Sequence, residues 1–393
     1  MTEPTAHAEW DALTADELRR RGGLKWSDGD DVLAAWVAEM DFGTAPAVTE
    51  ALAEAASRHE FGYATPAQID ELAEATAQWF ATRYGWAPPA SAIRPLPDVV
   101  VGLLETLRHF SNPVAAVVVP TPAYMPFLFA PPMLGRQVRQ VPMIEDEWGI
   151  LRLDLAAIDA ELDRGADVVI LANPANPAGR VYEREELDAL ARVADSRGAR
   201  VFSDEIHAPL TLYGAQHVPF ASVSETAANV AVTATSASKA WNLAGLKAAE
   251  LVLTNPADLE RWARVGMLTE HGASTPGIRA HIAAYRDGDA WLGDVIRYVE
   301  RNDRALRERM AERLPLARIA PLQGTYLAWI DLTRYGVPDD PAEWLLDTAR
   351  VHVNGGTVFG SAGAGRIRFN LAMPRPLLID AVDRIADAVT AQR

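Results

Sequence analysis

Through the middle of the sequence, six short runs of apolar and β-branched residues alternate with segments of helical periodicity. In one helical segment, Leu187, Leu190, Ala191 and Ala194 form a single apolar stripe. Alternation of this kind predicts an α/β fold, in which helices cover both faces of a mainly parallel sheet. The predicted buried strands are Ala115–Val119, Val138–Val141, Val168–Leu171, Arg200–Phe202, Val230–Thr233 and Leu251–Leu253.

The pattern changes near Trp291, and this change predicts a second, smaller domain. At 393 residues, the chain is longer than one compact core usually accommodates. We therefore expect a large domain over residues 46–289 and a smaller α+β domain made of residues 1–45 and 290–393. The elements predicted for the smaller domain are a helix over Trp291–Leu314 ended by Pro315, a strand within Thr325–Leu332, a helix over Glu343–Ala349, a strand over Arg366–Asn370 and a last helix from Arg375.

Charge and composition exclude several classes of partner. The chain has 37 Lys and Arg residues against 53 Asp and Glu residues, a formal charge of −16, and no basic patch. We therefore expect no nucleic-acid partner. Cysteine is absent, which excludes disulfides and thiol nucleophiles and fits a reducing compartment. The N-terminus lacks the basic and apolar regions of a signal peptide, so we predict a cytoplasmic protein.

One stretch is long enough to be tested as a membrane helix. Phe110–Gly135 contains no charged residue, and its length would span a bilayer. It also contains six prolines, which would leave backbone groups unpaired in lipid. We expect a buried strand followed by a rigid loop, and no membrane partner.

Four loops that follow predicted strands carry side chains suited to chemistry. In a parallel sheet, such loops gather at the carboxyl edge. Each has a plain alternative, because Asn-Pro repeats form turns and Tyr124 can simply pack. Asp204, Glu205 and His207 can form a solvated acidic turn or part of a metal site, but no spacing suggests further ligands, so we expect no metal. The four loops are Pro120–Tyr124, Ala172–Arg180, Ser203–His207 and Ala234–Lys239.

The lysine count singles out Lys239. Only three of the 37 basic residues are lysines: Lys25, Lys239 and Lys247. Arginine cannot replace a lysine that must lose its proton near neutral pH, whereas Lys25 and Lys247 can be chance survivors. An amine among hydroxyl residues suits a phosphate-bearing aldehyde. With a carboxylate for a pyridinium, an aromatic face and an asparagine, Lys239 predicts a pyridoxal 5′-phosphate (PLP) site.

Motifs along essentially the whole chain also resemble one enzyme superfamily. They are Trp36–Phe42, Gly62-Tyr63, Pro122–Phe127, Asn173–Arg180, Ser203–His207, Ser238–Leu246, Gly355–Gly360 and Arg368–Leu371. As a set they resemble fold-type I PLP enzymes of the aminotransferase class I/II superfamily, and within it the MalY/PatB branch of cystathionine β-lyases (C–S lyases). The resemblance implies a large domain with a seven-stranded, mainly parallel sheet sandwiched by helices, a smaller α+β domain, and PLP as cofactor.

The resemblance also implies roles for individual residues. It implies that Lys239 binds PLP as a Schiff base and moves the Cα proton, that Asp204 pairs with the pyridine nitrogen, and that Arg368 holds the substrate carboxylate. It further implies that Tyr124 stacks on the ring, that Asn176 binds the phenolic oxygen, and that Asn176 and Ala38 lie near the substrate. The implied phosphate contacts are Ser236, Ser238 and the amides of Val99 and Val100. The resemblance also implies a homodimer, in which Tyr63 of the neighbouring subunit reaches the phosphate.

Three positions keep alternatives open. His207 lies near the same phenolic oxygen or is a structural histidine. Lys247 stands where the superfamily often has a phosphate-binding arginine, so it binds phosphate or is there by chance. Asp98 stands where the branch commonly has glycine, and we expect it to cap the helix Val99–Phe110 and point away, because a carboxylate pointing inward would oppose the phosphate.

Two reactions would use the same residues. In a C–S β-lyase, Lys239 takes the Cα proton of L-cystathionine or a related cysteine S-conjugate, a thiolate leaves, and pyruvate and ammonia form. In an aminotransferase, the proton returns to the cofactor instead. We expect the lyase, because no motif supplies a second cation for a second substrate carboxylate, whereas Phe127, Trp36 and Tyr124 can line an apolar space. A non-catalytic module of the same fold is a third alternative.

Overall fold

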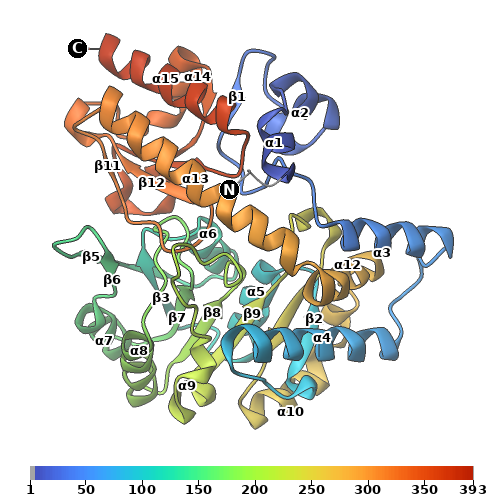
Figure 1. Cartoon of the computed structure of the whole chain (residues 1–393). Coiled ribbons are helices and arrows are strands. Elements are labelled where there is room, and N and C mark those ends of the chain that lie inside the picture. The colour runs from blue at the N-terminus through green and yellow to red at the C-terminus, as the bar shows by residue number, and fades with distance from the viewer. Residues whose placement is uncertain (1–4, 393) are drawn as a thin grey trace.

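The computed structural model describes residues 5–392, and a seven-stranded sheet lies at its centre (Figure 1). In spatial order, the strands are β2 (Ile93–Leu96), β10 (Ala249–Val252), β9 (Ala231–Thr235), β8 (Arg200–Asp204), β7 (Ala166–Ala172), β3 (Ala116–Thr121) and β4 (Val138–Pro142). Neighbouring strands pair in parallel except around β10, which is antiparallel to both β2 and β9. The predicted α/β fold with a mainly parallel sheet is confirmed.

The two edge strands are where sequence and structure differ. All six predicted runs are strands, but the sequence does not predict β2, because Arg94 and Pro95 interrupt its apolar pattern. A proline, which cannot donate a hydrogen bond, is tolerated in an edge strand. At the other edge, only Val141 of β4 is buried, so the prediction of a buried strand over Val138–Val141 is wrong. An edge strand has a neighbour on one side only.

Helices cover both faces of this sheet (Figure 1). Successive strand residues point to opposite faces, so Val118 and Val169 enter one apolar cluster while Val117 and Val168 enter the other. The first cluster is covered by α7 (Leu155–Asp163), α8 (Arg184–Ser196) and α9 (Glu225–Val230), and the second by α5 (Val99–His109), α6 (Pro126–Met133) and α10 (Pro256–Val265).

The uncharged stretch Phe110–Gly135 forms β3 and then helix α6, where the sequence predicts a loop. Pro126 occupies the first turn of α6, where a missing N–H breaks no helical hydrogen bond. Pro131 and Pro132 lie in the last turn, and the helix ends at Met133. No helix in the described part of the chain, residues 5–392, is long and apolar enough to cross a membrane.

A second, antiparallel sheet contains the C-terminal strands (Figure 1). Its spatial order is β11 (Arg318–Ile319), β12 (Leu327–Asp331), β15 (Arg366–Asn370) and β14 (Asn354–Gly355). Helices α13 (Asp289–Arg313), α14 (Pro341–Ala349) and α15 (Arg375–Ala391) pack beside it. The N-terminal part joins this region, because β1 (Leu33–Ala34) pairs in parallel with β13 (Val351–His352).

The domain boundaries at residues 46 and 289 stay a prediction, and residues 1–4 and 393 lie outside the described part. The remaining helices and strands are α1 (Thr5–Asp11), α2 (Ala15–Arg21), α3 (Pro46–Ser57), α4 (Pro66–Tyr84), α11 (Met267–Glu270), α12 (Thr275–Asp287) and the hairpin of β5 (Ile144–Glu145) and β6 (Leu151–Arg152). Short 3-10 helices cover Leu24–Trp26, Ala90–Ala92, Phe220–Ser222, Ala244–Leu246, Thr333–Tyr335, Gly356–Phe359 and Ser361–Gly363.

Candidate active site

A cavity of about 310 Å³ lies at the carboxyl edge of the seven-stranded sheet. Loops after β3, β7, β8 and β9 line it, together with the start of α5, residues 37–39 and one residue of β15. The predicted site residues that line it are Ala38, Val99, Val100, Tyr124, Asn176, Asp204, His207, Ser236, Ser238, Lys239, Lys247 and Arg368. The sequence therefore predicts correctly which strand ends meet, whereas Tyr63, which is expected to act on the neighbouring subunit, does not line the cavity of its own chain.

Lys239 follows β9 and directs its amine into this cavity. Its Nζ donates a hydrogen bond to the backbone oxygen of Ala38 at 2.9 Å. Burial, reinforced by the charge of Arg368, lowers the pKa of Lys239 to about 8. An amine with this pKa is partly neutral near physiological pH, so it can act as a nucleophile and as a base.

Asp204 is the last residue of β8, and its carboxylate is buried. Burial raises the pKa of Asp204 to about 7, although the Ile206 amide donates to Oδ1 at 3.0 Å and opposes the rise. A positive charge placed beside this carboxylate would lower its pKa again. The position therefore suits a cationic ring nitrogen.

Glu205, unlike Asp204, does not line the cavity, and its side chain bonds with His217 and Phe220 instead. Its Oε2 lies 3.1 Å from His217 Nε2, and its Oε1 accepts from the Phe220 amide at 2.8 Å. Glu205 is therefore not available as a ligand for the alternative metal site at Ser203–His207. Across residues 5–392, no group of three or more His, Asp or Glu side chains could hold a metal ion.

His207 lines the cavity, and its ring meets that of Tyr326 edge to face, with ring centres 6.0 Å apart. The Nδ1 atom of His207 is buried without a hydrogen-bond partner. Burial, with the charges of Lys239 and Arg368, lowers the pKa of His207 well below its usual value, so the ring is neutral. Tyr326 donates to the oxygen of Ala38 at 2.8 Å. The sequence does not predict Tyr326, because it precedes β12 in a segment without a motif.

The N-terminus of α5 forms one end of the cavity. Asp98 caps this helix, accepting from the Val101 amide at 2.8 Å, so the predicted capping role is confirmed, but Asp98 also lines the cavity, so the prediction that it points away is wrong. Its second oxygen lies 3.2 Å from Nζ of Lys247 at the cavity edge. The amides of Val99 and Val100 are in the first turn, where a helix offers them no carbonyl partner. Such a helix start favours an anion.

Ser236 already uses both sides of its hydroxyl group. It donates to the oxygen of Ala248 at 2.9 Å and accepts from the Ser238 amide at 3.0 Å. The two bonds hold the loop after β9 in a fixed bend, with Ser236 and Ser238 both in the cavity lining. Contact with a phosphate would require the Ser236 hydroxyl to exchange its donor bond to Ala248.

Arg368 lies on β15 and reaches the cavity as a buried cation held by neutral groups. It donates to Oδ1 of Asn176 at 3.0 Å, to Oδ1 of Asn354 at 2.6 Å and to the oxygen of Trp36 at 2.8 Å. Its Nε is buried without a partner, and burial lowers the pKa of Arg368 to about 10. Because its acceptors carry no charge, this guanidinium is suited to bind a carboxylate in two-pronged fashion.

Two predicted lining residues lie elsewhere. Phe127 is on α6, and its ring belongs to the apolar core between that helix and the sheet. Trp36 stacks on His352 with ring centres 4.4 Å apart, and its Nε1 donates to the oxygen of Lys25. Neither residue lines the cavity, so the prediction that they surround a sulfur substituent is wrong, whereas Tyr124 does line it.

These residues fit PLP. The cavity holds an amine of lowered pKa, a carboxylate of raised pKa and a helix start with free amides, which match the aldehyde, the ring nitrogen and the phosphate. Buried polar atoms without a partner are rare, and two of them, His207 Nδ1 and Arg368 Nε, belong to residues of this cavity. Bound PLP would supply an electron-withdrawing ring beside the substrate.

Comparison with known proteins decides the family. The model for "Aminotransferase class I and II" matches residues 36–385 of the chain. The chain belongs to this family. The motif resemblance described above is thereby confirmed, including the fold-type I architecture and the PLP cofactor.

Relatives narrow the position within the class I and II aminotransferases. The chain is 37% identical to the cystathionine β-lyase of Corynebacterium glutamicum, over 95% of this chain and 98% of the relative. It is 34% identical to the cystathionine β-lyase PatB of Bacillus subtilis, over 92% and 93%. A solved structure of a candidate PLP-dependent β-cystathionase of Corynebacterium diphtheriae matches with a TM-score of 0.90 and 40% identity, covering 96% and 98%.

Proposed function

We propose that this chain is a PLP-dependent C–S β-lyase that cleaves L-cystathionine or a related cysteine S-conjugate. One observation carries the choice over an aminotransferase for dicarboxylic substrates. Among the described residues of one chain, Arg368 is the single arginine that lines the cavity. The lining also contains two lysines, Lys239 and Lys247, and Lys247 is paired with Asp98. One free guanidinium serves the α-carboxylate, and no second one remains for a side-chain carboxylate. The similarity to cystathionine β-lyases supports the same choice.

The residues divide the work between binding and proton transfer. Arg368 holds the α-carboxylate, and this contact orients the Cα–H bond toward Lys239. When bound, PLP would supply an electron-withdrawing group next to Cα. Lys239 accepts the Cα proton, the Cβ–S bond breaks, and the thiolate leaves with the bonding electron pair. The remaining three-carbon enamine takes up water and yields pyruvate and ammonia. Asp204 keeps the ring nitrogen protonated throughout.

The test is to supply L-cystathionine to the PLP-loaded protein without any keto acid, and to follow pyruvate and free thiol. Continuous release of both in equal amounts supports the lyase. Turnover without pyruvate or thiol, which stops after one equivalent of cofactor has been converted to its amine form and resumes when a keto acid is added, identifies an aminotransferase instead.

We further propose a homodimer in which Tyr63 of each subunit reaches the phosphate of the other. Tyr63 is 87% exposed, and its ring stacks on His271 at the end of α11 with centres 5.9 Å apart. Phe61, two residues earlier, and Met267 and Leu268 of α11 are exposed as well. Exposed apolar patches of this kind are typical of protein interfaces.

Subunit exchange tests the shared site. A mixture of inactive Lys239→Ala and impaired Tyr63→Ala subunits forms heterodimers, and each heterodimer contains one complete site. Activity should therefore rise after mixing. Activity that stays at the sum of the two parents would exclude a contribution of Tyr63 across the interface.

The domain division at residues 46 and 289 and the cytoplasmic location are also part of the proposal. The pairing of β1 with β13 supports the grouping of the N-terminal segment with the C-terminal one. The cysteine-free composition supports a reducing compartment. Limited proteolysis should cut first near the two proposed boundaries, and cell fractionation should recover the protein with cytoplasmic markers.

A further inference from the structure

Lys25, which the sequence allows to be a chance lysine, is buried in an ion pair. Its Nζ lies 3.0 Å from Oδ2 of Asp41, and both side chains are at most 3% exposed. The Asp41 partner is itself oriented, because Trp26 Nε1 donates to its Oδ1 at 2.8 Å. Burial lowers the pKa of Lys25 and raises that of Asp41, and each charge opposes the shift of the other. A lysine that is present only by chance is expected on the surface, where its charge stays hydrated. The burial of Lys25 in an ion pair therefore requires another explanation.

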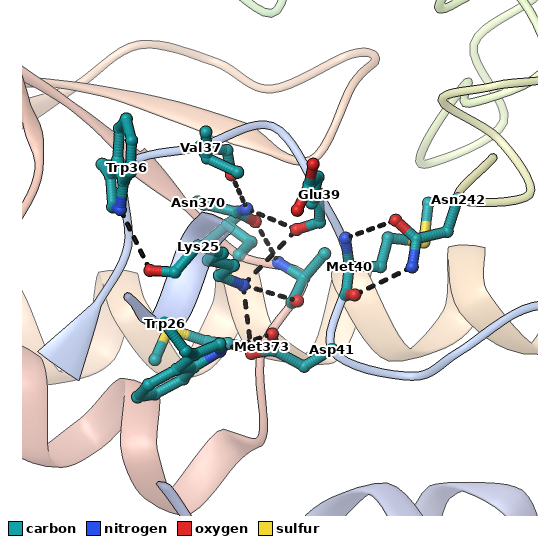
Figure 2. A network of polar contacts seen from close by, with 12 residues as sticks. Lys25, Trp26, Trp36, Val37, Glu39, Met40, Asp41, Asn242, Asn370 and Met373 are labelled. Atoms are coloured by element: carbon teal, nitrogen blue, oxygen red, sulfur yellow. Dashed lines mark hydrogen bonds and ion pairs between the residues drawn. The ribbon is translucent and has the colours of Figure 1, made fainter. Parts of the chain in front are cut away.

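The pair belongs to a network that holds residues 36–41, here called the 36–41 segment (Figure 2). Asn370 donates to the oxygens of Val37 and Glu39 at 2.6 and 2.7 Å. Lys25 donates to the oxygens of Glu39 and Ala372. At the far end, Asn242 accepts from the Met40 amide and donates to the Met40 oxygen, both at 2.9 Å. The segment is thus fixed from three sides, although it forms no helix or strand.

What this network holds in place is a set of carbonyl groups facing the active site. The Ala38 oxygen accepts from Lys239 and from Tyr326, and the Trp36 oxygen accepts from Arg368. The segment therefore touches both the amine that would move the proton and the guanidinium that would hold the substrate. Lys25, by contrast, does not line the cavity.

We propose that the Lys25–Asp41 pair is a positioning device for Lys239, acting through the carbonyl of Ala38. A hydrogen bond from the Lys239 amine to that carbonyl fixes one N–H direction and thereby limits the lone pair to the two remaining positions around the Cε–Nζ bond. A shift of the 36–41 segment turns the lone pair away from the carbon it must reach. Lys25 touches neither substrate nor cofactor, so it is a positioning residue. This inference rests on the role proposed for Lys239.

Stability alone is a weak explanation for such a pair. Two charges lose their hydration when they are buried, and a neutral pair of similar volume is often as stable or more stable. Removing only one partner leaves an unpaired buried charge, which is strongly destabilising. The informative variant therefore removes both charges together: Lys25→Met with Asp41→Asn, whose amide oxygen can still accept from Trp26.

The experiment measures how fast cofactor-free protein attaches added PLP to Lys239, followed by the absorbance of the lysine-bound cofactor. The Lys25→Met/Asp41→Asn protein should melt within a few degrees of wild type but attach PLP at least about tenfold more slowly, since a displacement near 1 Å can cost up to about 100-fold. With substrate, kcat should fall by a similar factor while KM changes little. Wild-type attachment and kcat in a folded double variant would overturn the proposal.

A second variant and a matched control complete the test. Asn242→Gly removes both bonds to Met40 without straining the backbone, because residue 242 has φ of 61°, which glycine adopts freely. It leaves the ion pair intact and should slow PLP attachment in the same direction. If the double variant does not fold, wild-type attachment by Asn242→Gly overturns the proposal by itself.

The control is Arg136→Met/Asp167→Asn, which neutralises another ion pair, with an N–O distance of 2.6 Å and an arginine only 1% exposed. Neither residue lines the cavity, and attachment should stay at the wild-type rate. Equal slowing in the control would also overturn the proposal, because any lost ion pair would then have the same effect. The rate of PLP attachment is measured without substrate, so it can be determined even if the protein does not catalyse the lyase reaction. The positioning proposal and the lyase proposal can therefore be contradicted independently.

Discussion

Two regions of the molecule build the active site by different means. At the carboxyl edge of the seven-stranded sheet, Tyr124, Asn176, Asp204 and Lys239 each follow, or end, a strand of their own. Their convergence is a property of the parallel sheet. The 36–41 segment has no such frame, and side chains from distant parts of the chain hold it in place.

The difference separates residues that carry chemistry from residues that set geometry. A strand-end variant should lose a chemical step while the fold and the neighbouring side chains remain. A variant of the network around the 36–41 segment should slow the same step in proportion to a displacement. The predictions that follow test this separation, starting with the largest expected effect.

Lys239→Ala should abolish turnover and the yellow colour of the PLP-loaded protein. Covalent attachment and proton transfer are lost together, so we expect a fall of at least about 10⁴-fold. Absorbance spectra after dialysis, with circular dichroism to check folding, make the measurement. Lys247→Ala is the control, because it removes the other lysine of the cavity, and it should keep the colour. A coloured Lys239→Ala protein would contradict the assignment.

Asp204→Asn should lower kcat by about 10²- to 10³-fold. Removing one partner of a buried ion pair costs about 3–5 kcal/mol, and here the lost charge is the one that keeps the ring nitrogen protonated. PLP affinity should fall less than the rate, because the phosphate and Lys239 contacts remain. Steady-state kinetics with saturating PLP give the first quantity and a cofactor titration the second. A near-wild-type kcat would show that another group protonates the ring.

The same variant makes a prediction about pH in the cofactor-free protein. The pKa of Asp204 is about 7 in the folded protein, compared with the usual value of 3.8 that applies to the unfolded chain. Between these values the unfolded chain loses the proton and the folded chain keeps it, so rising pH removes stability. The melting temperature of Asp204→Asn should therefore fall less than that of wild type between about pH 5 and pH 7. Parallel curves for the two proteins would contradict the raised pKa.

Arg368→Gln should raise KM far more than it lowers kcat, for any substrate with an α-carboxylate. The loss of a charge-assisted, buried contact costs about 2–5 kcal/mol, equal to about 30-fold or more in kcat/KM. Asn354→Ala, which removes one of the neutral acceptors of Arg368, should have a smaller effect in the same direction. An unchanged KM in Arg368→Gln would place the carboxylate elsewhere.

The smallest effect is expected for Asp98→Asn at the phosphate end. Asparagine keeps the helix cap, while the loss of the charge frees Lys247 and removes a carboxylate from the phosphate end. The pair is partly exposed, with side chains 59% and 37% accessible. Its effect should therefore stay within about 1 kcal/mol, a tightening of PLP binding of up to about fivefold. Weaker binding would show that Asp98 helps to hold the cofactor by another route.

The limits of prediction from sequence follow the same division. Strand ends are predictable because each depends on a few consecutive residues, and they bring Tyr124, Asn176, Asp204, His207 and Lys239 to the cavity. The prediction for Phe127 is wrong because the prolines around it predict a loop, whereas the segment forms helix α6. In this helix the Phe127 ring packs in the apolar core between α6 and the sheet. The network that holds the 36–41 segment is not predicted, because its contacts are non-local: Asn370 bonds to the oxygen of Val37 from 333 positions away.

The pairing of β1 with β13 has a consequence for how the enzyme is made. A ribosome delivers β1 more than 300 residues before β13, and Lys25 has no Ala372 to bond until later still. The seven-stranded sheet can close while the C-terminal region is still being synthesised, because domains tend to fold from the N-terminus as they emerge. The nascent chain therefore carries Lys239 before Ala38 is held beside it. We therefore expect activity to require synthesis and folding of the chain at least as far as Arg368 and Ala372.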